Sequence, residues 1–314
     1  MKILLLCSYR YYAPYTDYVA PFIYEQMHGL KTLGCEFRVC FVKGGGAKSY
    51  IRAWREIREA IIEYQPDLIH AHYGLCGLVA NMQRKVPVIC TYHGSDINNF
   101  KTRWISKLAI RLSQMNIFVS NKLCSKAGNP SSSIVIPCGV NIEEFYPMNK
   151  EQCRKNLGMD LNRVYVLFSK AFDVPVKNYP LAKSAIEYLL EKGMNIELVE
   201  LKGYTREQVV QLMNACDCVL MTSFNEGSPQ FIKEALACNS PIVSTNVGDV
   251  KEQISCLPNC YLTTYDPLDV AEKIEKCLKD FVDLPLARER VLKQYNNNKI
   301  VSKIFKLYNT LCKD

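Results

Sequence analysis

Two carboxylates in one short segment have a spacing that suits a phosphorylated sugar. Glu226 and Glu234 are separated by seven residues, and the run Gly227-Ser228-Pro229 lies between them. Carboxylate oxygens accept hydrogen bonds from hydroxyl groups. The segment could therefore hold a sugar on one side of a diphosphate and a ribose on the other.

The residues between the two carboxylates predict the start of a helix. Serine is a preferred N-cap and proline a preferred first helical residue, so Ser228 and Pro229 are expected in these positions. The backbone N–H groups of Gln230 and Phe231 would then lack helical partners and could hold an anion. An ordinary amphipathic helix is the alternative, with an apolar stripe and a solvated Lys233-Glu234 face.

Histidines form the second group of residues that could take part in chemistry. His93-Gly94-Ser95-Asp96 follows an expected strand, so His93 would lie at the carboxyl end of that strand and face a cleft. A turn that Asp96 merely caps is the alternative. His70 and His72 end another strand, where we expect them to point to opposite faces. That arrangement argues against a shared metal ion.

Amino-acid composition and net charge narrow the type of protein and the types of binding partner that we expect. The 314 residues are 48% apolar and 22% charged, which fits a soluble chain with two α/β domains. The net charge of +8 suits an anionic substrate or an anionic membrane surface. No run of five Lys/Arg residues and no nucleic-acid module is visible, so no nucleic-acid partner is expected.

Cysteines and apolar runs indicate the compartment. The 15 cysteines are scattered without a C-x-x-C pair, which indicates reduced and mostly buried thiols inside a cell. The apolar run at residues 3–7 is too short for a signal peptide, and no run approaches the roughly 20 residues of a membrane span. We expect a cytoplasmic protein that could also bind peripherally to the inner face of the plasma membrane.

Alternating strands and helices predict two parallel sheets that position these groups. The expected strands are residues 2–7, 36–42, 67–71, 87–92, 116–120 and 133–137, and then 165–169, 196–201, 218–222, 241–245 and 261–264. Helical patterns lie between them, for example at residues 22–33, 49–64 and 150–157. The domains are predicted at 1–150 and 151–297, with ligands beyond the carboxyl ends of the strands. Residues 298–314 are expected to form a helix that crosses back to the first domain.

The segment around the two carboxylates resembles the donor-site signature of retaining glycosyltransferases of family 4. The matching residues are Ser223, Glu226-Gly227, Pro229, Glu234-Ala235-Leu236-Ala237-Cys238, Pro241-Ile242-Val243, Gly248 and Glu252. The resemblance implies the GT-B fold, in which two Rossmann-like parallel-sheet domains face an interdomain cleft. Within the family, the second half is most similar to the bacterial polysaccharide transferases of the teichuronic-acid-biosynthesis type.

The resemblance also implies roles for individual residues. Lys177, Glu226 and His93 would take part in catalysis, with His93 near the donor sugar. The implied donor-binding residues are Lys170, Lys177, Glu226, Gly227, Ser228, Pro229, Gln230 and Glu234. No metal or other cofactor is implied, and the nucleotide-diphosphate sugar is a co-substrate.

Two departures from the family pattern concern the phosphate and acceptor sides. Where relatives carry an arginine before the second-domain lysine, only Lys170 is available, and an ordinary exposed lysine is the alternative. The usual glycine pair after the first strand is absent from residues 9–21. That loop, with Tyr15 and Tyr18, could face the acceptor together with Asp96, or its tyrosines could be surface aromatics.

Together these features predict a retaining glycosyltransferase in bacterial cell-surface polysaccharide biosynthesis. It would transfer a sugar from a nucleotide-diphosphate sugar to a hydroxyl of a glycan or lipid-linked acceptor. A nucleotide-sugar hydrolase or epimerase of the same fold and a non-catalytic nucleotide-sugar-binding module are the alternatives. A dinucleotide-dependent oxidoreductase is disfavoured, because no G-x-G-x-x-G follows the first strand.

Overall fold

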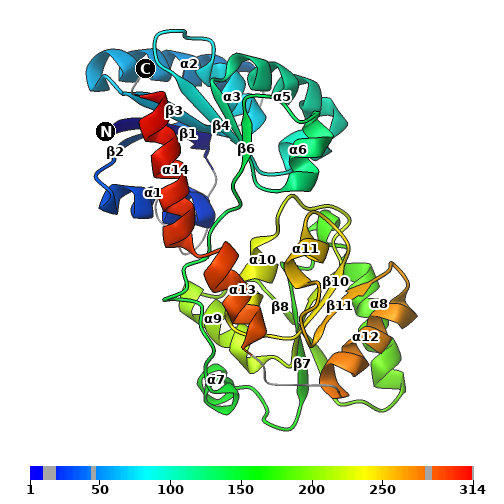
Figure 1. The fold of residues 1–314 in the computed structure, drawn as a ribbon. Helices are drawn as coiled ribbons and strands as arrows, with labels where there is room; N and C mark the ends of the chain where they lie inside the picture. The colour runs from blue at the N-terminus through cyan, green and yellow to red at the C-terminus, as the bar shows by residue number, and fades with distance from the viewer. Residues whose placement is uncertain (10–18, 44–46, 280–284, 313–314) are drawn as a thin grey trace. The chain divides into compact units, whose positions relative to one another are not determined.

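The computed structural model describes residues 1–9, 19–43, 47–279 and 285–312. Tyr15, Tyr18 and the glycine run at residues 44–46 lie outside these ranges. The chain forms two compact units, Met1–Gly139 with Asn297–Asp314 and Val140–Asn296 (Figure 1). None of the helices in the described ranges combines the length and apolar character needed to cross a bilayer.

The first unit contains a six-stranded parallel sheet in the order β2-β1-β3-β4-β5-β6. The strands are β1 Lys2–Ser8, β2 Glu36–Val42, β3 Leu68–His72, β4 Val88–Tyr92, β5 Met115–Phe118 and β6 Ser133–Val135. The helices are α1 Pro21–Thr32, α2 Ala47–Tyr64, α3 Gly74–Ala80, α4 Ser95–Asn98, α5 Phe100–Leu112, α6 Asn121–Ala127 and α14 Asn297–Leu311.

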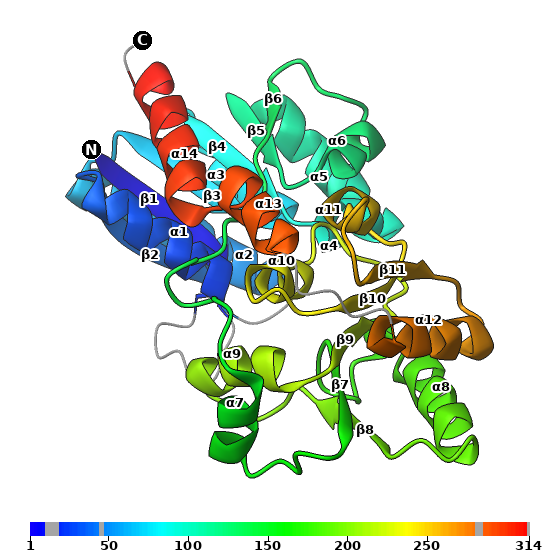
Figure 2. The same cartoon turned by 60° about the horizontal axis from the view of Figure 1, so that its bottom comes forward.

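Successive side chains of the β1 strand point to opposite faces, so helices cover both sides of this sheet. Leu4 packs with residues of α2, α3 and α5, whereas Ile3 packs with residues of α1 and α14. Helices α1 and α14 lie side by side in both views (Figures 1 and 2). The predicted terminal helix therefore belongs to the first unit, and it begins at Asn297.

The second unit contains a five-stranded parallel sheet in the order β11-β10-β9-β7-β8. The strands are β7 Val164–Phe168, β8 Ile196–Glu200, β9 Cys218–Met221, β10 Ile242–Thr245 and β11 Cys260–Thr263. The helices are α7 Lys150–Leu157, η1 Pro175–Lys177, α8 Tyr179–Glu191, α9 Arg206–Ala215, α10 Gln230–Ala237, α11 Val250–Ile254, α12 Pro267–Lys279 and α13 Leu286–Gln294. Residues of α8 and α12 form the core on one face, and residues of α9, α10 and α13 form the core on the other.

The α/β prediction with two parallel sheets is confirmed, since all eleven predicted strands are present with ends that differ by at most two residues. The units divide after Gly139, earlier than the predicted boundary near residue 150. The physical reason is that Val140 and Phe145 are buried in the core of the second unit. The loop that leads out of the first sheet thus already belongs to the second.

Both sheets share one strand order, because the first strand of each lies between the second and the third. In such sheets the order reverses at a switch point, where the loops that follow the strands part and leave a crevice. The switch points lie between β1 and β3 and between β7 and β9. The functional residues are therefore sought in the loops after these strands.

Candidate active site

An ion pair lies at the switch point of the second unit. The Lys177 Nζ is 2.5 Å from the Glu226 Oε1, and the two side chains are only 16% and 18% exposed. Lys177 ends the short η1 helix after β7, and Glu226 lies in the loop after β9. The structure therefore brings together the cation predicted for the diphosphate and the carboxylate predicted for the sugar.

Hydrogen bonds fix both partners of this ion pair. The buried Ser223 donates its hydroxyl to Glu226 Oε1 at 2.9 Å. The Thr222 hydroxyl lies 2.9 Å from the Lys177 carbonyl and 3.0 Å from the Asn178 carbonyl, and it is placed to donate to either. Asn178 has a φ of 53°, a left-handed conformation that asparagine tolerates. Residues at the end of β9 thus orient both charged groups.

The start of α10 differs from the prediction by one residue. Pro229 is the N-cap residue and Gln230 the first helical residue, with no side chain capping the helix. The predicted cap by Ser228 is wrong, because its hydroxyl donates to Asp249 Oδ2 at 2.8 Å instead. Asp249 also accepts from Gln253 Nε2 at 2.6 Å, so a later segment of the chain competes successfully for the serine.

The loop before α10 also requires a glycine on its neighbouring segment. Gly248 has a φ of +55°, and a Cβ at this position would lie 2.8 Å from the carbonyl oxygen of Gly227. No larger residue fits this backbone approach without a shift. Gly248, part of the family signature, therefore lets the segment after β10 pack directly against the Glu226-Gly227 turn.

Glu234 and Lys233 are not on a solvated face, so that alternative for α10 is wrong. Lys233 is fully buried and donates to Gln230 Oε1 at 2.9 Å. Glu234 is 2.9 Å from Arg206 Nη1, and burial raises the pKa of its carboxyl although the Arg206 charge opposes the shift. The carboxylate predicted to bind a ribose is thus held by a guanidinium in this structure.

Sequence reasoning missed Arg206. Its Nε donates to both carboxylate oxygens of Glu144 at 3.0 Å, and its guanidinium lies over the Phe145 ring, 4.3 Å from the centroid. Arg206 is the first residue of α9, after a Thr205 N-cap that forms a capping box with Gln208. The T-x-x-Q pattern beyond the carboxyl end of β8 is the signal that could have placed this arginine at the same edge of the sheet.

Lys170 follows β7 and is exposed as a residue. Its pKa is lowered, first by partial burial of the ammonium group and then by the positive charge of Lys177, while Glu234 acts in the opposite direction. Lys170 is therefore within electrostatic range of both the predicted phosphate-binding lysine and the predicted ribose-binding carboxylate.

In the first unit, His93 stands at the end of β4 in contact with a second histidine. The His93 Nε2 is 2.9 Å from His72 Nδ1, and its Nδ1 is 3.8 Å from the Cys138 sulfur. The Phe22 and Tyr73 rings lie 4.8 and 4.9 Å from its ring. The ring of His93 is thus oriented by groups at the carboxyl edge of its own sheet.

The prediction that His70 and His72 point to opposite faces is wrong. Their rings stack with centroids 4.5 Å apart, because residues two positions apart in a strand share a face. Burial lowers the pKa of His70 to about 3 and that of His72 well below its ordinary value. No group of three or more His, Cys, Asp or Glu side chains suited to a metal ion occurs in the part of the chain that the structure describes.

Asp96 is buried and stabilises the turn that follows His93. Its carboxylate accepts backbone N–H bonds from Gly94 at 2.9 Å and from Gly74 at 3.2 Å. Burial raises the pKa of this carboxyl to about 6. These bonds match the capping alternative considered for the H-G-x-D turn.

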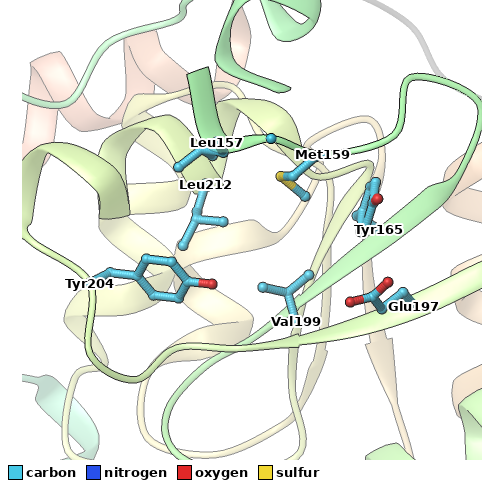
Figure 3. A pocket seen from close by; sticks show the side chains of 8 residues that line it. Leu157, Met159, Tyr165, Glu197, Val199, Tyr204 and Leu212 are labelled. Atoms are coloured by element: carbon cyan, nitrogen blue, oxygen red, sulfur yellow. The ribbon is translucent and has the colours of Figure 1, made fainter. Parts of the chain in front are cut away.

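A separate pocket lies beside the edge strand β8 of the second unit (Figure 3). It is lined by Leu157, Gly158, Met159, Tyr165, Glu197, Val199, Tyr204 and Leu212, most of them apolar. None of the predicted site residues belongs to this lining. The pocket is therefore distinct from the ion pair at the switch point.

Comparison with protein families covers both units. Residues 31–144 match Glycosyltransferase Family 4, and residues 178–280 match glycosyl transferases group 1. Each unit of the chain thus matches a glycosyltransferase family model, and the first unit matches that of family 4. Two matches of the same kind, one in each unit, agree with the signature around Glu226 and Glu234.

Individual relatives of this chain are distant in sequence. A Bacillus subtilis protein named as the teichuronic acid biosynthesis glycosyltransferase TuaC is 27% identical over 237 residues, which cover 65% of this chain and 61% of that protein. The N,N'-diacetylbacillosaminyl-diphospho-undecaprenol alpha-1,3-N-acetylgalactosaminyltransferase of Campylobacter jejuni is 25% identical, over 70% of this chain and 66% of its own length. The chain thus matches about three-fifths to two-thirds of the length of these relatives.

Solved structures establish the fold. Sucrose-phosphate synthase from Thermosynechococcus elongatus superposes with a TM-score of 0.83 at 18% identity, over 99% of this chain and 98% of that one. Anabaena HepE in complex with UDP-glucose superposes with a TM-score of 0.78 at 18% identity, over 99% of this chain and all of that one. These likenesses and the two parallel sheets confirm the GT-B fold class.

Proposed function

We propose that this chain is a retaining glycosyltransferase that takes a sugar from a nucleotide-diphosphate sugar. The acceptor would be a hydroxyl of a glycan or of a lipid-linked saccharide, in the synthesis of a bacterial cell-surface polysaccharide. The Lys177–Glu226 pair at the β7/β9 switch point carries the proposal. A cation and a carboxylate 2.5 Å apart, before the start of α10, offer one partner for a phosphate and one for a sugar hydroxyl.

The diphosphate would lie between Lys177 and the first turn of α10. Backbone N–H groups at a helix start and the helix dipole favour an anion there. Lys177 would exchange part of its contact with Glu226 for a phosphate oxygen, and Lys170 would add a second charge from the same loop. In this proposal these cations, with no metal or other cofactor, stabilise the negative charge that develops on the leaving diphosphate.

Glu226 would accept hydrogen bonds from the sugar, held in place by Ser223. Glu234 would accept from the ribose, as the family signature implies. His93 would orient the sugar from the first unit, with its ring held by His72. The acceptor oxygen would form its bond to the anomeric carbon on the face that the diphosphate leaves, with its proton passing to the departing phosphate oxygen.

Related proteins support the choice of substrates. The Anabaena structure holds UDP-glucose, and the Campylobacter relative is named for transfer to a diphospho-undecaprenol saccharide. The fold match supports a nucleotide-sugar donor, and the relative supports a lipid-linked acceptor.

A thermal-shift screen against nucleotide sugars tests the donor. A ligand at 100 times its Kd stabilises the folded state by about 2.7 kcal/mol, so a true donor should raise the Tm by several degrees. Product analysis with and without an undecaprenyl-diphosphate saccharide then separates transfer from hydrolysis or epimerisation. Binding without any product would identify a binding module instead.

Matched variants test the assigned residues. Lys177→Ala and Glu226→Ala should each lower kcat/KM by about 100-fold or more, since each removes a charged contact to the reacting group. The ion pair of Lys183 and Glu187 on α8 is exposed and provides the control substitutions K183A and E187A. Full activity of the Lys177 or Glu226 variant would contradict the proposal.

A further inference from the structure

Helix α5 of the first unit exposes three large apolar side chains in a row. Phe100, Trp104 and Leu108 are 74%, 65% and 41% exposed. Their spacing of four residues places them on one outward stripe of the helix, within about 80° of arc. Single exposed apolar residues are ordinary, but an aligned row of this size marks an interaction surface.

Positive charges border this stripe. At 100° per residue, Lys107 and Lys101 lie on either side of the three apolar positions, and Arg111 continues the row at the end of the helix. All three are exposed. Within the described ranges none of the three forms an ion pair, so their charges remain available to a partner.

The neighbouring helix extends the basic surface. Helices α5 and α6 lie near one another in both views (Figures 1 and 2). Lys122 and Lys126 of α6 are exposed, and burial together with the charges of Arg103 and Lys122 lowers the pKa of Lys126. Neither helix contains an aspartate or a glutamate. A cluster of cations without local acidic partners is suited to an anionic surface.

The opposite side of α5 is packed firmly, so the stripe does not result from a loosely held helix. Ser106 and Ala109 are buried, and a Cβ on Gly74 of α3 would lie 2.0 Å from the Ser106 hydroxyl oxygen. Arg103 donates to the carbonyls of Ile97 and Asn98 at 2.7 and 3.2 Å. The helix therefore presents its outward residues from a fixed position on the first unit.

We propose that the outward face of α5, with Lys122 and Lys126 of α6, docks onto an anionic lipid bilayer. Phe100, Trp104 and Leu108 enter the interfacial region, where aromatic and leucine side chains are favoured. The lysines and Arg111 bind lipid phosphates around them. This surface is separate from the proposed sugar-transfer chemistry and would place the first unit beside lipid-linked substrates.

Charge decides between a bilayer and a second copy of the chain. A symmetric contact between two α5 faces would bring the bordering cations of both copies together, and like charges across an interface are unfavourable. Anionic lipid neutralises the same charges. Each cation near such a surface adds about five-fold to the affinity at moderate salt.

Tryptophan fluorescence gives a direct measurement of docking. The chain has two tryptophans, and Trp54→Phe leaves Trp104 as the sole reporter. Trp54 is partly buried and its indole N–H has no partner in the described part of the chain, so this change removes no hydrogen bond. Vesicles of phosphatidylglycerol and phosphatidylcholine should shift the Trp104 emission to shorter wavelength, whereas pure phosphatidylcholine vesicles should not.

Vesicle sedimentation of the full chain separates the apolar and charged contributions. Phe100→Ser with Trp104→Ser should weaken binding to the anionic vesicles by about ten-fold or more. Leu268→Ser with Leu286→Ser, two exposed leucines of the second unit, is the matched control and should have no effect.

The contribution of the charged residues is tested in the same assay with two triple variants that change the net charge equally. K101Q/K107Q/R111Q should lose most of the binding, and the loss should resemble that caused by high salt. K299Q/K303Q/K306Q removes three exposed lysines of α14 and should retain the binding.

Three results would overturn the proposal. Equal vesicle binding by the α5 and α14 charge variants would show that binding depends only on net charge and not on the position of the charges. An unchanged Trp104 emission on anionic vesicles would show that the stripe does not enter the bilayer. A concentration-dependent dimer that F100S/W104S abolishes, without lipid binding by the unsubstituted chain, would assign the stripe to self-association. Each readout is independent of sugar transfer, so a failed assay for the proposed enzyme leaves this test intact.

Discussion

Acidification should destabilise the first unit because its sheet buries a neutral histidine. His70 is fully buried, with its ring nitrogens 2.5 Å from the Tyr308 hydroxyl and 2.7 Å from Thr91 Oγ1. Burial lowers its pKa to about 3 in the folded state. The unfolded chain takes up a proton near the ordinary histidine pKa of about 6.5. The stability that the neutral ring contributes is therefore present above about pH 6.5 and is lost as the pH falls below it.

The size of this loss follows from the two pKa values. Each pH unit between them costs about 1.4 kcal/mol, so His70 alone should cost about 2 kcal/mol between pH 6.5 and 5.0. His72, whose pKa burial also lowers, acts in the same direction. Asp96 acts in the opposite direction, because burial raises its pKa to about 6 and the folded state gains protons below that pH. Protonation of Asp96 stabilises the folded state by about 1.4 kcal/mol by pH 5.0, which offsets part of the loss from the two histidines and leaves a net loss.

Urea unfolding followed by tryptophan fluorescence measures this loss in the right unit. Trp54 and Trp104, the two tryptophans of the chain, lie in the first unit. His70→Gln should flatten the dependence of the unfolding free energy on pH by about 1.4 kcal/mol per unit, whatever its effect at pH 7.5. His28→Gln, at an exposed position on α1, should leave the slope unchanged. A free energy that stays constant from pH 6.5 to 5.0, or an unchanged slope in the His70 variant, would refute the reasoning.

Three further predictions concern the stability of the second unit and its ligand-binding residues. Gly248→Ala should lower the unfolding free energy by about 2 kcal/mol, since its Cβ would meet the Gly227 carbonyl; Gly203→Ala, at positive φ in open space, should cost about half as much in the same urea titration. Arg206→Gln should leave Glu234 without its guanidinium, so a calorimetric titration should show nucleotide-diphosphate binding changed by at least about five-fold; an unchanged Kd would remove both residues from the site. Ser223→Ala should weaken kcat/KM by about ten-fold through the loss of its bond to the site carboxylate, and unaltered steady-state kinetics would show that the bond is dispensable.

The sheets could be predicted from the sequence because their signals are local. Strands with buried apolar runs, such as Cys218–Met221, alternate with amphipathic helices, and the side-chain pattern alone reveals them. The carboxyl-end loops follow from this alternation, since parallel strands bring them to one edge. The family resemblance assigns Lys177 and Glu226, 49 residues apart, to one site, and the two side chains lie in contact.

The contacts that sequence reasoning missed join residues far apart in the chain. Ser228 has the residue type of an N-cap, but Asp249 lies 21 positions later and takes its hydroxyl. Arg206 lies 28 positions before Glu234, and only the packing of α9 beside α10 residues in one core brings them together. Local propensity contains no information on such competition. The stacked histidines of β3 are different, because the two-residue period of a strand was sufficient to place them on one face.

Because α14 is synthesised after the second unit, the two units can complete their folding at different times during synthesis. Residues 140–296 of the second unit are contiguous and can pack as soon as they leave the ribosome. The first unit must wait, because Ile300, Val301, Ile304 and Tyr308 of α14 fill one side of its core. Until those residues emerge, Ile3 and Leu68 face water on a nascent and incomplete sheet. A chaperone that binds apolar surface should therefore associate with ribosome-bound chains that end near residue 296, and it should dissociate once α14 is released.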